Sequence, residues 1–176
     1  MTDVSVVIPL YNKARYIARA IDSVLNQTFA DWELIVVDDG STDDGAAIVG
    51  RYEDSRITLL QQDNSGVSIA RNQGILHSNS EFIALLDADD EWLPEFLEVA
   101  IRMLEEYPHT SMAATNYILY QSDGKRIMEE PPRDMPVVQV RRDFFSASLP
   151  PNLSLITSST VVIRKRFLAR AGLFPP

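Results

Sequence analysis

The stretch VSVVIPLYNK, residues 4–13, decides the fold class. Its first part, residues 4–10, is almost entirely β-branched or apolar, a pattern typical of a strand that is covered on both faces in a parallel sheet. The polar residues YNK end the strand, and from residue 16 onward apolar residues recur at three- and four-residue steps. That period predicts a helix with one apolar face, so the chain begins with a strand followed by a helix.

The same alternation continues to about residue 105. Apolar runs predict further strands at residues 33–37, 56–60 and 81–86, and helical periods predict helices around residues 48–52, 68–76 and 94–104. Strands that alternate with helices in this way imply right-handed crossovers. The fold class is therefore α/β, with a Rossmann-like, mostly parallel sheet flanked by helices.

The pattern weakens beyond residue 108. We expect strands at residues 112–120 and 157–163, a turn at 123–124 that leads into 125–128, and a helix at 142–147. A basic helix is expected at residues 164–171, where its cations form a solvated face, and Gly172 ends it. We expect one domain with two halves, residues 1–108 and 109–176, of which the second is incomplete at its C-terminus.

Composition excludes several classes of function. The 176 residues contain 25 acidic and 16 basic side chains, so a net charge of −9 argues against nucleic acid as a partner. The absence of cysteine excludes disulfides and thiolate chemistry. No apolar run approaches the roughly 20 residues that are needed to cross a membrane. The N-terminal residues also lack the basic region with which a signal peptide begins. We expect a cytoplasmic protein, with peripheral membrane association as the alternative.

Polar clusters follow three of the predicted strands: PLYN after the first, DDGS after the second and DADD after the fourth. In open parallel sheets, ligands bind at the carboxyl ends of the strands, so these clusters are expected to meet. The sequence contains no P-loop, no GxGxxG after the first strand and no GxSxG nucleophile elbow.

The DADD run places three carboxylates within four residues. Along an extended chain, alternation points Asp87 and Asp89 the same way. Two such oxygen ligands suit Mg²⁺ or Mn²⁺, which bind proteins through one or two carboxylates together with substrate phosphates. The alternative is a solvated turn in which Asp89 or Asp90 caps the next helix.

Each of the other candidate residues has two interpretations. Asp38 and Asp39 could bind a base or ribose, or could close a turn. Arg71 could contact a base carbonyl or a phosphate, or could form an ion pair with a strand-end aspartate. Tyr11 could stack on a planar base, or could flank the first strand as a half-buried aromatic residue.

Taken together, four segments resemble family 2 glycosyltransferases of the GT-A fold. They are VVIPLYNK at residues 6–13, SVLNQTFADWELIVVDDGSTDDG at 23–45, NSGVSIARNQG at 64–74 and LLDADDEWLP at 85–94. A weaker likeness, at residues 159–174, is to the segment that precedes the family's catalytic-base motif. Four motifs in the right order are specific, so the resemblance favours the functional interpretations above.

The resemblance implies transfer of a sugar, with inversion, from a nucleotide-diphosphate donor, expected to be a UDP-sugar. The acceptor would be a saccharide or a lipid-linked molecule in cell-surface polysaccharide or glycoconjugate synthesis. Residues 1–108 would then be the nucleotide-sugar-binding half and residues 109–176 the acceptor-side half. The general base is an aspartate expected beyond Pro176, so we assign no catalytic residue.

The resemblance also assigns individual residues to the donor site. The nucleotide-binding residues would be those flanking the base, binding the base and contacting the ribose: Pro9, Tyr11, Asp39, Arg71 and Asp87. The metal ligands, for Mn²⁺ or Mg²⁺, would be Asp87 and Asp89 of a DxD motif, with Asp90 as an alternative because DADD allows the register to shift by one.

Three other classes share parts of this pattern. A sugar nucleotidyltransferase would have a glycine-rich basic loop after the first strand, where this chain has PLYNK. A receiver domain would have its acidic pair after the first strand, whereas here the pair follows the second. A non-catalytic nucleotide- or sugar-binding module remains the alternative, because no general base can be assigned.

Overall fold

The protein is described by a computed structural model in which residues 3–115, 117–120, 126–127 and 157–175 are placed. The elements follow one another along the chain as β1 (Val4–Leu10), α1 (Ala14–Leu25), β2 (Trp32–Asp39), α2 (Gly45–Val49), β3 (Ile57–Gln62), α3 (Val67–His77), β4 (Phe82–Leu85), α4 (Phe96–Glu106), β5 (Met112–Ala114), β6 (Leu119–Tyr120), β7 (Arg126–Ile127), the 3₁₀-helix η1 (Ser158–Thr160), β8 (Val161–Arg164) and α5 (Lys165–Ala171).

Six strands form one sheet in the order β3-β2-β1-β4-β8-β5. The four strands of the N-terminal half are parallel, whereas β8 pairs antiparallel with both β4 and β5. The α/β class and the mostly parallel sheet predicted from the sequence are therefore confirmed. Because β1 lies between β2 and β4, the polar loops that follow these three strands open at the same edge of the sheet.

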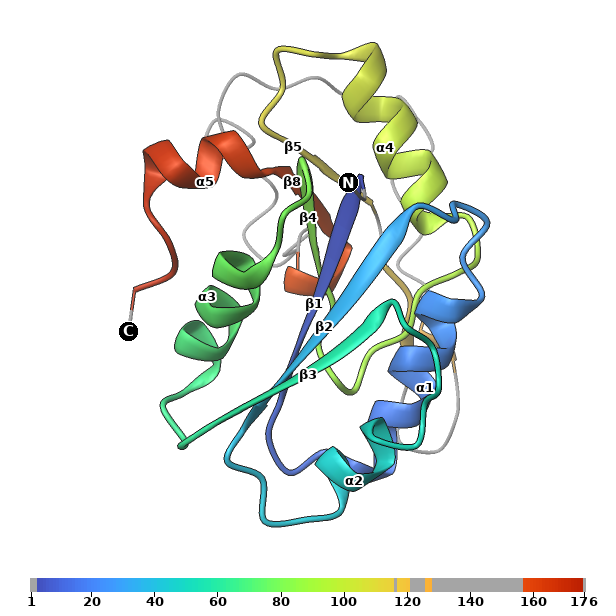
Figure 1. Cartoon of the computed structure of the whole chain (residues 1–176). Coiled ribbons are helices and arrows are strands. Elements are labelled where there is room, and N and C mark those ends of the chain that lie inside the picture. Colours follow the sequence, from blue (N-terminus) through green and yellow to red (C-terminus); the bar gives the residue numbers. More distant parts are fainter. Residues whose placement is uncertain (1–2, 116, 121–125, 128–156, 176) are drawn as a thin grey trace.

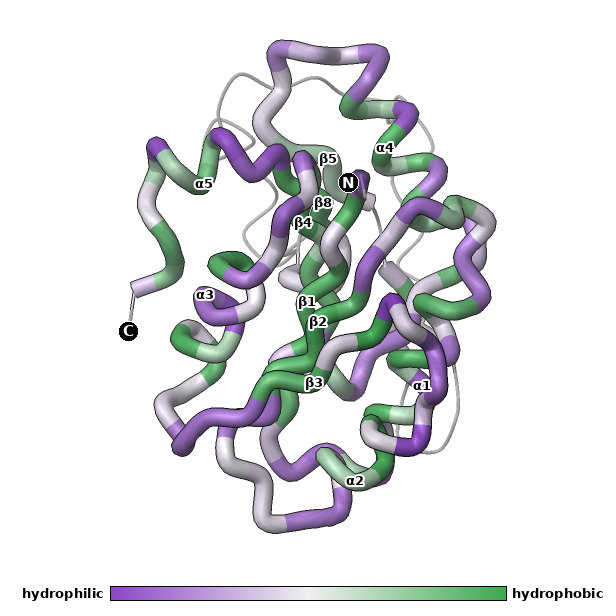
Figure 2. Tube along the Cα trace, in the orientation of Figure 1, coloured by the Kyte–Doolittle hydropathy of each residue, from purple (hydrophilic) through white to green (hydrophobic). Residues whose placement is uncertain are grey.

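Helices cover both faces of the sheet (Figure 1). Alternate side chains of β1, from Val4 to Leu10, pack into a core with α1 and α4, while Val7 faces a second core that includes Ile75 of α3. Figure 2 shows the strands as the hydrophobic centre of the molecule and the loops around them as hydrophilic. Burial on both faces explains why β1 lacks the polar alternation of a half-exposed strand.

Several predicted elements differ in detail from those observed. Residues 112–120 form two short strands, β5 and β6, and β6 pairs with β7 in a separate two-stranded sheet. Residues 158–160 form η1 before β8 begins, and α2 ends at Val49. The helix expected at residues 142–147 lies outside the described residues.

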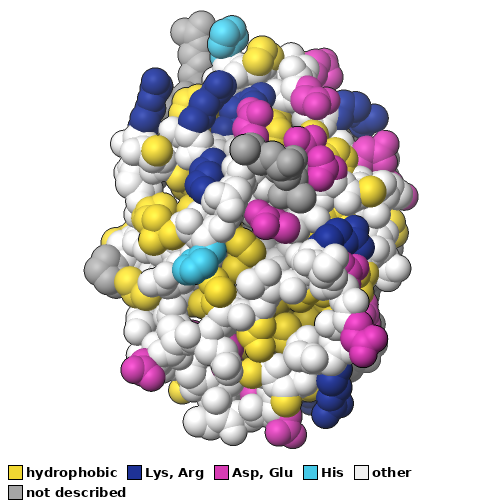
Figure 3. All heavy atoms as spheres, in the orientation of Figure 1, with side chains coloured by type: hydrophobic (Ala, Val, Ile, Leu, Met, Phe, Trp, Pro, Cys, Tyr) yellow, Lys and Arg dark blue, Asp and Glu magenta, His cyan; other side chains and the backbone are white. Residues whose placement is uncertain are grey.

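The basic segment at residues 164–170 divides between the core and the surface. Arg164 is 5% exposed and forms an ion pair of 2.7 Å with Glu81, so its assignment to a solvated helix face was wrong. The cations of α5 lie on the surface, where Lys and Arg side chains gather in Figure 3. Within the described part of the chain, no helix is long and apolar enough to cross a membrane.

The loop before β3 carries an ion pair that should make stability depend on pH. Hydrogen bonds from the Arg56 side chain and backbone lower the pKa of Asp54 to about 2, and the Arg56 guanidinium lies 3.7 Å from the centre of the Trp32 ring. Because the pKa of Asp54 is lowered in the folded protein, its ionised carboxylate stabilises the folded state at pH values above the ordinary carboxyl pKa. This stabilisation is lost as pH falls toward 2.

We expect Asp54→Asn to lower the melting temperature by roughly 1–3 °C at pH 6, because an exposed ion pair contributes little. The difference from the wild type should shrink between pH 4 and pH 2, as the wild-type carboxylate takes up its proton. Thermal unfolding followed by circular dichroism at several pH values measures it. A difference that stays constant down to pH 2 would contradict the assignment.

Candidate functional site

A cavity of about 590 Å³ opens where the carboxyl ends of β1, β2 and β4 meet. Six of the seven residues predicted for the donor site line it together: Pro9, Tyr11, Asp39, Arg71, Asp87 and Asp89. They come from four segments that are up to 80 positions apart in the sequence. Asp90, the alternative metal ligand, is not among the residues that line the cavity.

The loop after β1 is held by Asn12, whose φ of 52° lies in the left-handed region. Asparagine tolerates this conformation better than most residues. The Asn12 side-chain oxygen accepts a 2.8 Å hydrogen bond from the backbone N–H of Thr42, and the Asn12 N–H donates to the Ser41 hydroxyl at 3.0 Å. The loops after β1 and β2 are thereby joined, which leaves Tyr11, 48% exposed, at the cavity wall.

Asp43 lies in the loop after β2, just before α2 begins. Its carboxylate joins two helices, because one oxygen accepts a 2.8 Å hydrogen bond from the backbone N–H of Ala14, the first residue of α1. The other oxygen accepts from the N–H of Gly45, the first residue of α2. A carboxylate in this position also suits the positive ends of both helix dipoles.

Asp39 is only 3% exposed, and its carboxylate shapes the cavity from within the protein. One oxygen accepts hydrogen bonds from the Gln62 amide at 2.7 Å and the Ser65 N–H at 2.8 Å. The other oxygen accepts from the N–H of Gly66, at 2.8 Å, directly before α3. Asp39 therefore fixes the loop that leads into α3, in addition to lining the cavity.

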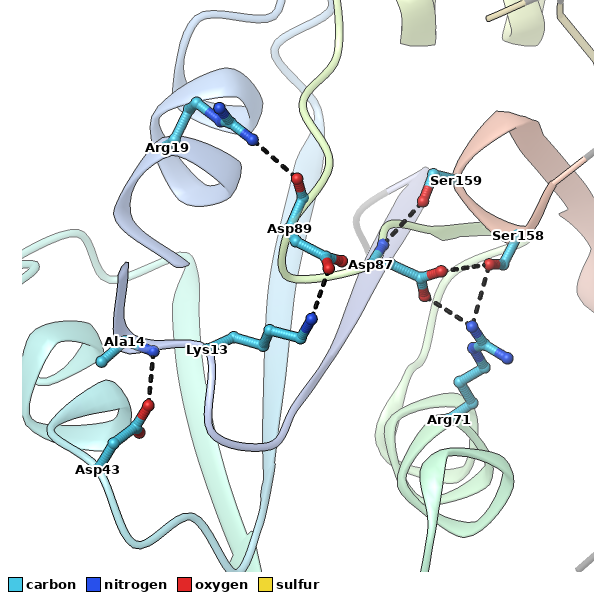
Figure 4. Close-up of polar contacts among 9 residues, drawn as sticks. All are labelled: Lys13, Ala14, Arg19, Asp43, Arg71, Asp87, Asp89, Ser158 and Ser159. Carbon is cyan, nitrogen blue, oxygen red and sulfur yellow. Dashed lines mark hydrogen bonds and ion pairs between the residues drawn. The ribbon is translucent and has the colours of Figure 1, made fainter. Parts of the chain in front are cut away.

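Arg71 of α3 reaches across the cavity wall to Asp87, as one of the two sequence interpretations predicted. Its Nη2 lies 2.6 Å from Asp87 Oδ1 and also donates to the Ser158 hydroxyl at 3.0 Å. The Ser158 hydroxyl in turn donates to Asp87 Oδ2 at 2.6 Å. These contacts, which Figure 4 shows, form a closed ring of three side chains from three distant segments.

Asp89 points toward a different partner. Its Oδ2 lies 2.6 Å from the Lys13 ammonium, and this hydrogen bond raises the pKa of Lys13. Asp87 and Asp89 thus pair with different cations, as Figure 4 shows, although both line the cavity. The extended chain assumed for them ends early, because β4 ends at Leu85 and the N–H of Asp90 closes a turn onto the carbonyl of Asp87.

Asp90 has a third environment. Although much of the residue is exposed, partial desolvation of its carboxyl raises its pKa, and the negative charges of Asp87 and Asp89 act in the same direction. A hydrogen bond with Ser159 opposes this shift. Asp90 therefore differs from Asp87 and Asp89, which line the cavity.

Three residues of this site have no role in the sequence predictions: Lys13, Ser158 and Ser159. Lys13 stands in the quoted motif VVIPLYNK, and its charge beside a polar strand end was a usable signal. The two serines were predicted to begin a strand, and nothing in TSSTVVI indicates that they reach a loop about 70 residues earlier.

The oxygen donors of this cavity fit a hard divalent cation. Within the described residues, no three acidic or histidine side chains gather into a ready-made metal site. Mg²⁺ and Mn²⁺, however, use one or two carboxylates and complete their shell with water and substrate phosphates. Asp87 and Asp89 supply such a pair at the cavity wall, each now neutralised by a side-chain cation.

Comparison with known proteins decides the family. The family model described as "Glycosyl transferase family 2" matches residues 5–170. The chain belongs to glycosyl transferase family 2. This family member therefore places the motifs of its N-terminal half, which carried the resemblance in sequence, around a single cavity.

Named relatives and solved structures agree with this assignment. The family member is 43% identical over 102 residues to the E. coli UDP-Glc:alpha-D-GlcNAc-diphosphoundecaprenol beta-1,3-glucosyltransferase WfgD, covering 57% of this chain and 40% of WfgD. S. aureus TarS 1–349 in complex with UDP-GlcNAc has a TM-score of 0.73 and 26% identity, covering 99% of this chain and 48% of that chain.

A second solved structure shares the fold. The mannosyltransferase PcManGT from Pyrobaculum calidifontis, in complex with GDP-Man and Mn²⁺, has a TM-score of 0.71 at 22% identity, covering 99% of this chain and 50% of that chain. The GT-A fold expected from the sequence is thus confirmed. The family 2 chain spans between 17% and 49% of the length of the curated relatives it matches.

Proposed function

We propose that this chain is the donor-binding part of an inverting glycosyltransferase that uses a UDP-sugar. The observation that carries the proposal is the cavity in which Tyr11, Arg71, Asp87 and Asp89 meet at the carboxyl edge of the sheet. Membership of family 2 and the likeness to TarS with UDP-GlcNAc support the choice of donor.

The nucleotide would lie across the loops after β1 and β2. Pro9 and Tyr11 would flank the uracil, which suits a tyrosine that is 48% exposed at the cavity wall. Asp39 would bind the base from the buried side while it holds the loop before α3. Arg71 would assist at the base, and Asp87 would contact the ribose.

Asp87 and Asp89 would hold Mn²⁺ or Mg²⁺, and Asp90 is the alternative ligand. A bound divalent ion would stabilise the negative charge that develops on the leaving diphosphate. Without it, two unit charges about 5 Å apart at an effective dielectric constant near 20 repel by about 3 kcal/mol. Lys13, which now pairs with Asp89, would be freed toward the phosphates when the metal replaces it.

The acceptor-side half would be residues 109–176, and the donor half residues 1–108. A saccharide or lipid-linked acceptor fits the name of WfgD, whose acceptor is a diphosphoundecaprenol-linked sugar. A lipid-linked acceptor would place the reaction at a membrane surface, where α5 presents its cations. The proposal assigns no general base within the described residues.

The proposal predicts metal-dependent nucleotide binding. We expect UDP to bind this chain at least about tenfold more tightly with Mn²⁺ than with excess chelator, because the metal removes part of the charge repulsion above. Isothermal titration calorimetry measures both affinities. Uridine, which lacks the diphosphate, is the control and should show no such dependence. Equal UDP affinities in the two conditions would overturn the proposal.

A further inference from the structure

Two adjacent serines of η1 hold Asp87 by its side chain and by its backbone. The Ser158 hydroxyl donates to Asp87 Oδ2 at 2.6 Å, and the Ser159 hydroxyl accepts a 2.9 Å hydrogen bond from the Asp87 N–H. The carbonyl of Ser159 also accepts a 2.6 Å hydrogen bond from the indole of Trp92. Residues 87–92 of the donor half are therefore attached to a short helix from the other half of the chain.

The contacts of Ser158 differ in kind from those of Ser159. Ser159 is 6% exposed, and its hydroxyl accepts from the backbone N–H of Asp87 while its carbonyl accepts from the indole of Trp92. Ser158 is half-buried, and the contacts found for its hydroxyl are with two charged side chains, Asp87 and Arg71. It donates to the first and accepts from the second, so a single hydroxyl sets the orientation of both.

The ring leaves little freedom to the groups that form it. One nitrogen of Arg71, Nη2, serves both Asp87 and Ser158, while Arg71 Nε is buried without a hydrogen-bond partner among the described residues. Arg71 is only 14% exposed, and its guanidinium lies 5.7 Å from the ring centre of Phe174. Among the described residues only Nη2 of this guanidinium forms hydrogen bonds, so Asp87 and Ser158 supply the polar contacts that hold it in place.

We propose that Ser158 is a positioning residue of the donor site, which orients the Asp87 carboxylate and the Arg71 guanidinium for a nucleotide diphosphate. The inference rests on the proposed function, because it assigns Ser158 to the same site. It also connects the two proposed halves of the chain, because Ser158 of η1, in the acceptor-side half, contacts Asp87 in the donor half (Figure 4).

Removal of the hydroxyl tests the inference. We expect Ser158→Ala to weaken UDP binding in Mn²⁺ by roughly tenfold, the usual effect of losing a hydrogen bond to a charged group. UDP binding in excess chelator should change less than twofold, and the melting temperature should stay within about 2 °C, because the hydroxyl is half-buried. Ser158→Thr, which keeps the hydroxyl, should restore most of the Mn²⁺-dependent affinity.

The matched control is Ser111→Ala, the same substitution at an exposed residue before β5, which should leave both affinities unchanged. If the wild type binds UDP more tightly in Mn²⁺ and Ser158→Ala does so equally, the positioning role is overturned while the proposed function stands. If the wild type shows no dependence on Mn²⁺, the proposed function fails first. A Ser158→Ala protein that unfolds would assign a structural role and would also overturn the inference.

Discussion

Replacing Asp89 by asparagine should abolish the dependence of UDP binding on Mn²⁺. In the wild type we expect a gain of at least about tenfold from the metal, and in Asp89→Asn a gain of less than about twofold, because the amide carries no charge to attract a divalent ion. Calorimetric titration of UDP with Mn²⁺ and with excess chelator gives the ratio directly. The loss is large because Asp89 would supply one of only two protein carboxylates.

In excess chelator, we expect the affinity of the same variant for UDP to change in the opposite direction. Asp89 now binds the Lys13 ammonium at 2.6 Å, and asparagine would release it. A free cation at the cavity wall attracts the diphosphate, so UDP should bind Asp89→Asn slightly more tightly than the wild type when no metal is present. General damage to the site would weaken binding in both conditions, which distinguishes it from loss of a metal ligand.

Asp31→Asn is the matched control, since it removes one negative charge from an exposed residue just before the amino end of β2, at the edge opposite the cavity. The ratio of affinities in this variant should equal that of the wild type. If Asp89→Asn kept the full gain from Mn²⁺, Asp89 would not be a ligand. The alternative ligand, Asp90, would then be examined by the same substitution.

Patterns that depend on neighbouring residues were sufficient to predict the framework of this site. The apolar runs of β1, β2 and β4 predicted parallel strands, and the rule that ligands bind at carboxyl ends placed Tyr11, Asp39 and Asp87 at one edge. The resemblance added specific roles to the same residues. The predictions of strands and of loop positions succeeded because strand burial and loop position follow from local periodicity, whereas the residue roles stay predictions.

The directions of the side chains could not be predicted in the same way. Alternation along an extended strand assumes that the strand continues, but β4 ends at Leu85, and after the turn that follows Asp87 pairs with Arg71 and Asp89 with Lys13. Similarly, the partner of Asp87 is Ser158, 71 positions away, and no local pattern encodes so distant a contact. Tertiary packing, rather than propensity, decides both features.

Replacing Gly74 by alanine should destabilise the framework of the donor site. A Cβ at this buried position of α3 would lie 2.3 Å from Cγ1 of Val7, which is itself fully buried in β1. Overpacking of this kind costs about 1–3 kcal/mol, partly offset by the better helix propensity of alanine. We expect the melting temperature to fall by roughly 4–10 °C, measured by circular dichroism.

Two variants separate steric conflict from a general effect of adding a methyl group. Gly50→Ala, where a Cβ would meet no atom closer than 3.6 Å, should leave stability unchanged or raise it slightly. Combining Gly74→Ala with Val7→Ala should cost at least about 1 kcal/mol less than the sum of the single effects, since the second change removes the conflicting atom. Additive costs would show that close packing of α3 on β1 is not the cause. Because α3 also carries Arg71, a variant that folds with α3 displaced should bind UDP more weakly, which would connect the packing of one glycine to the geometry of the donor site.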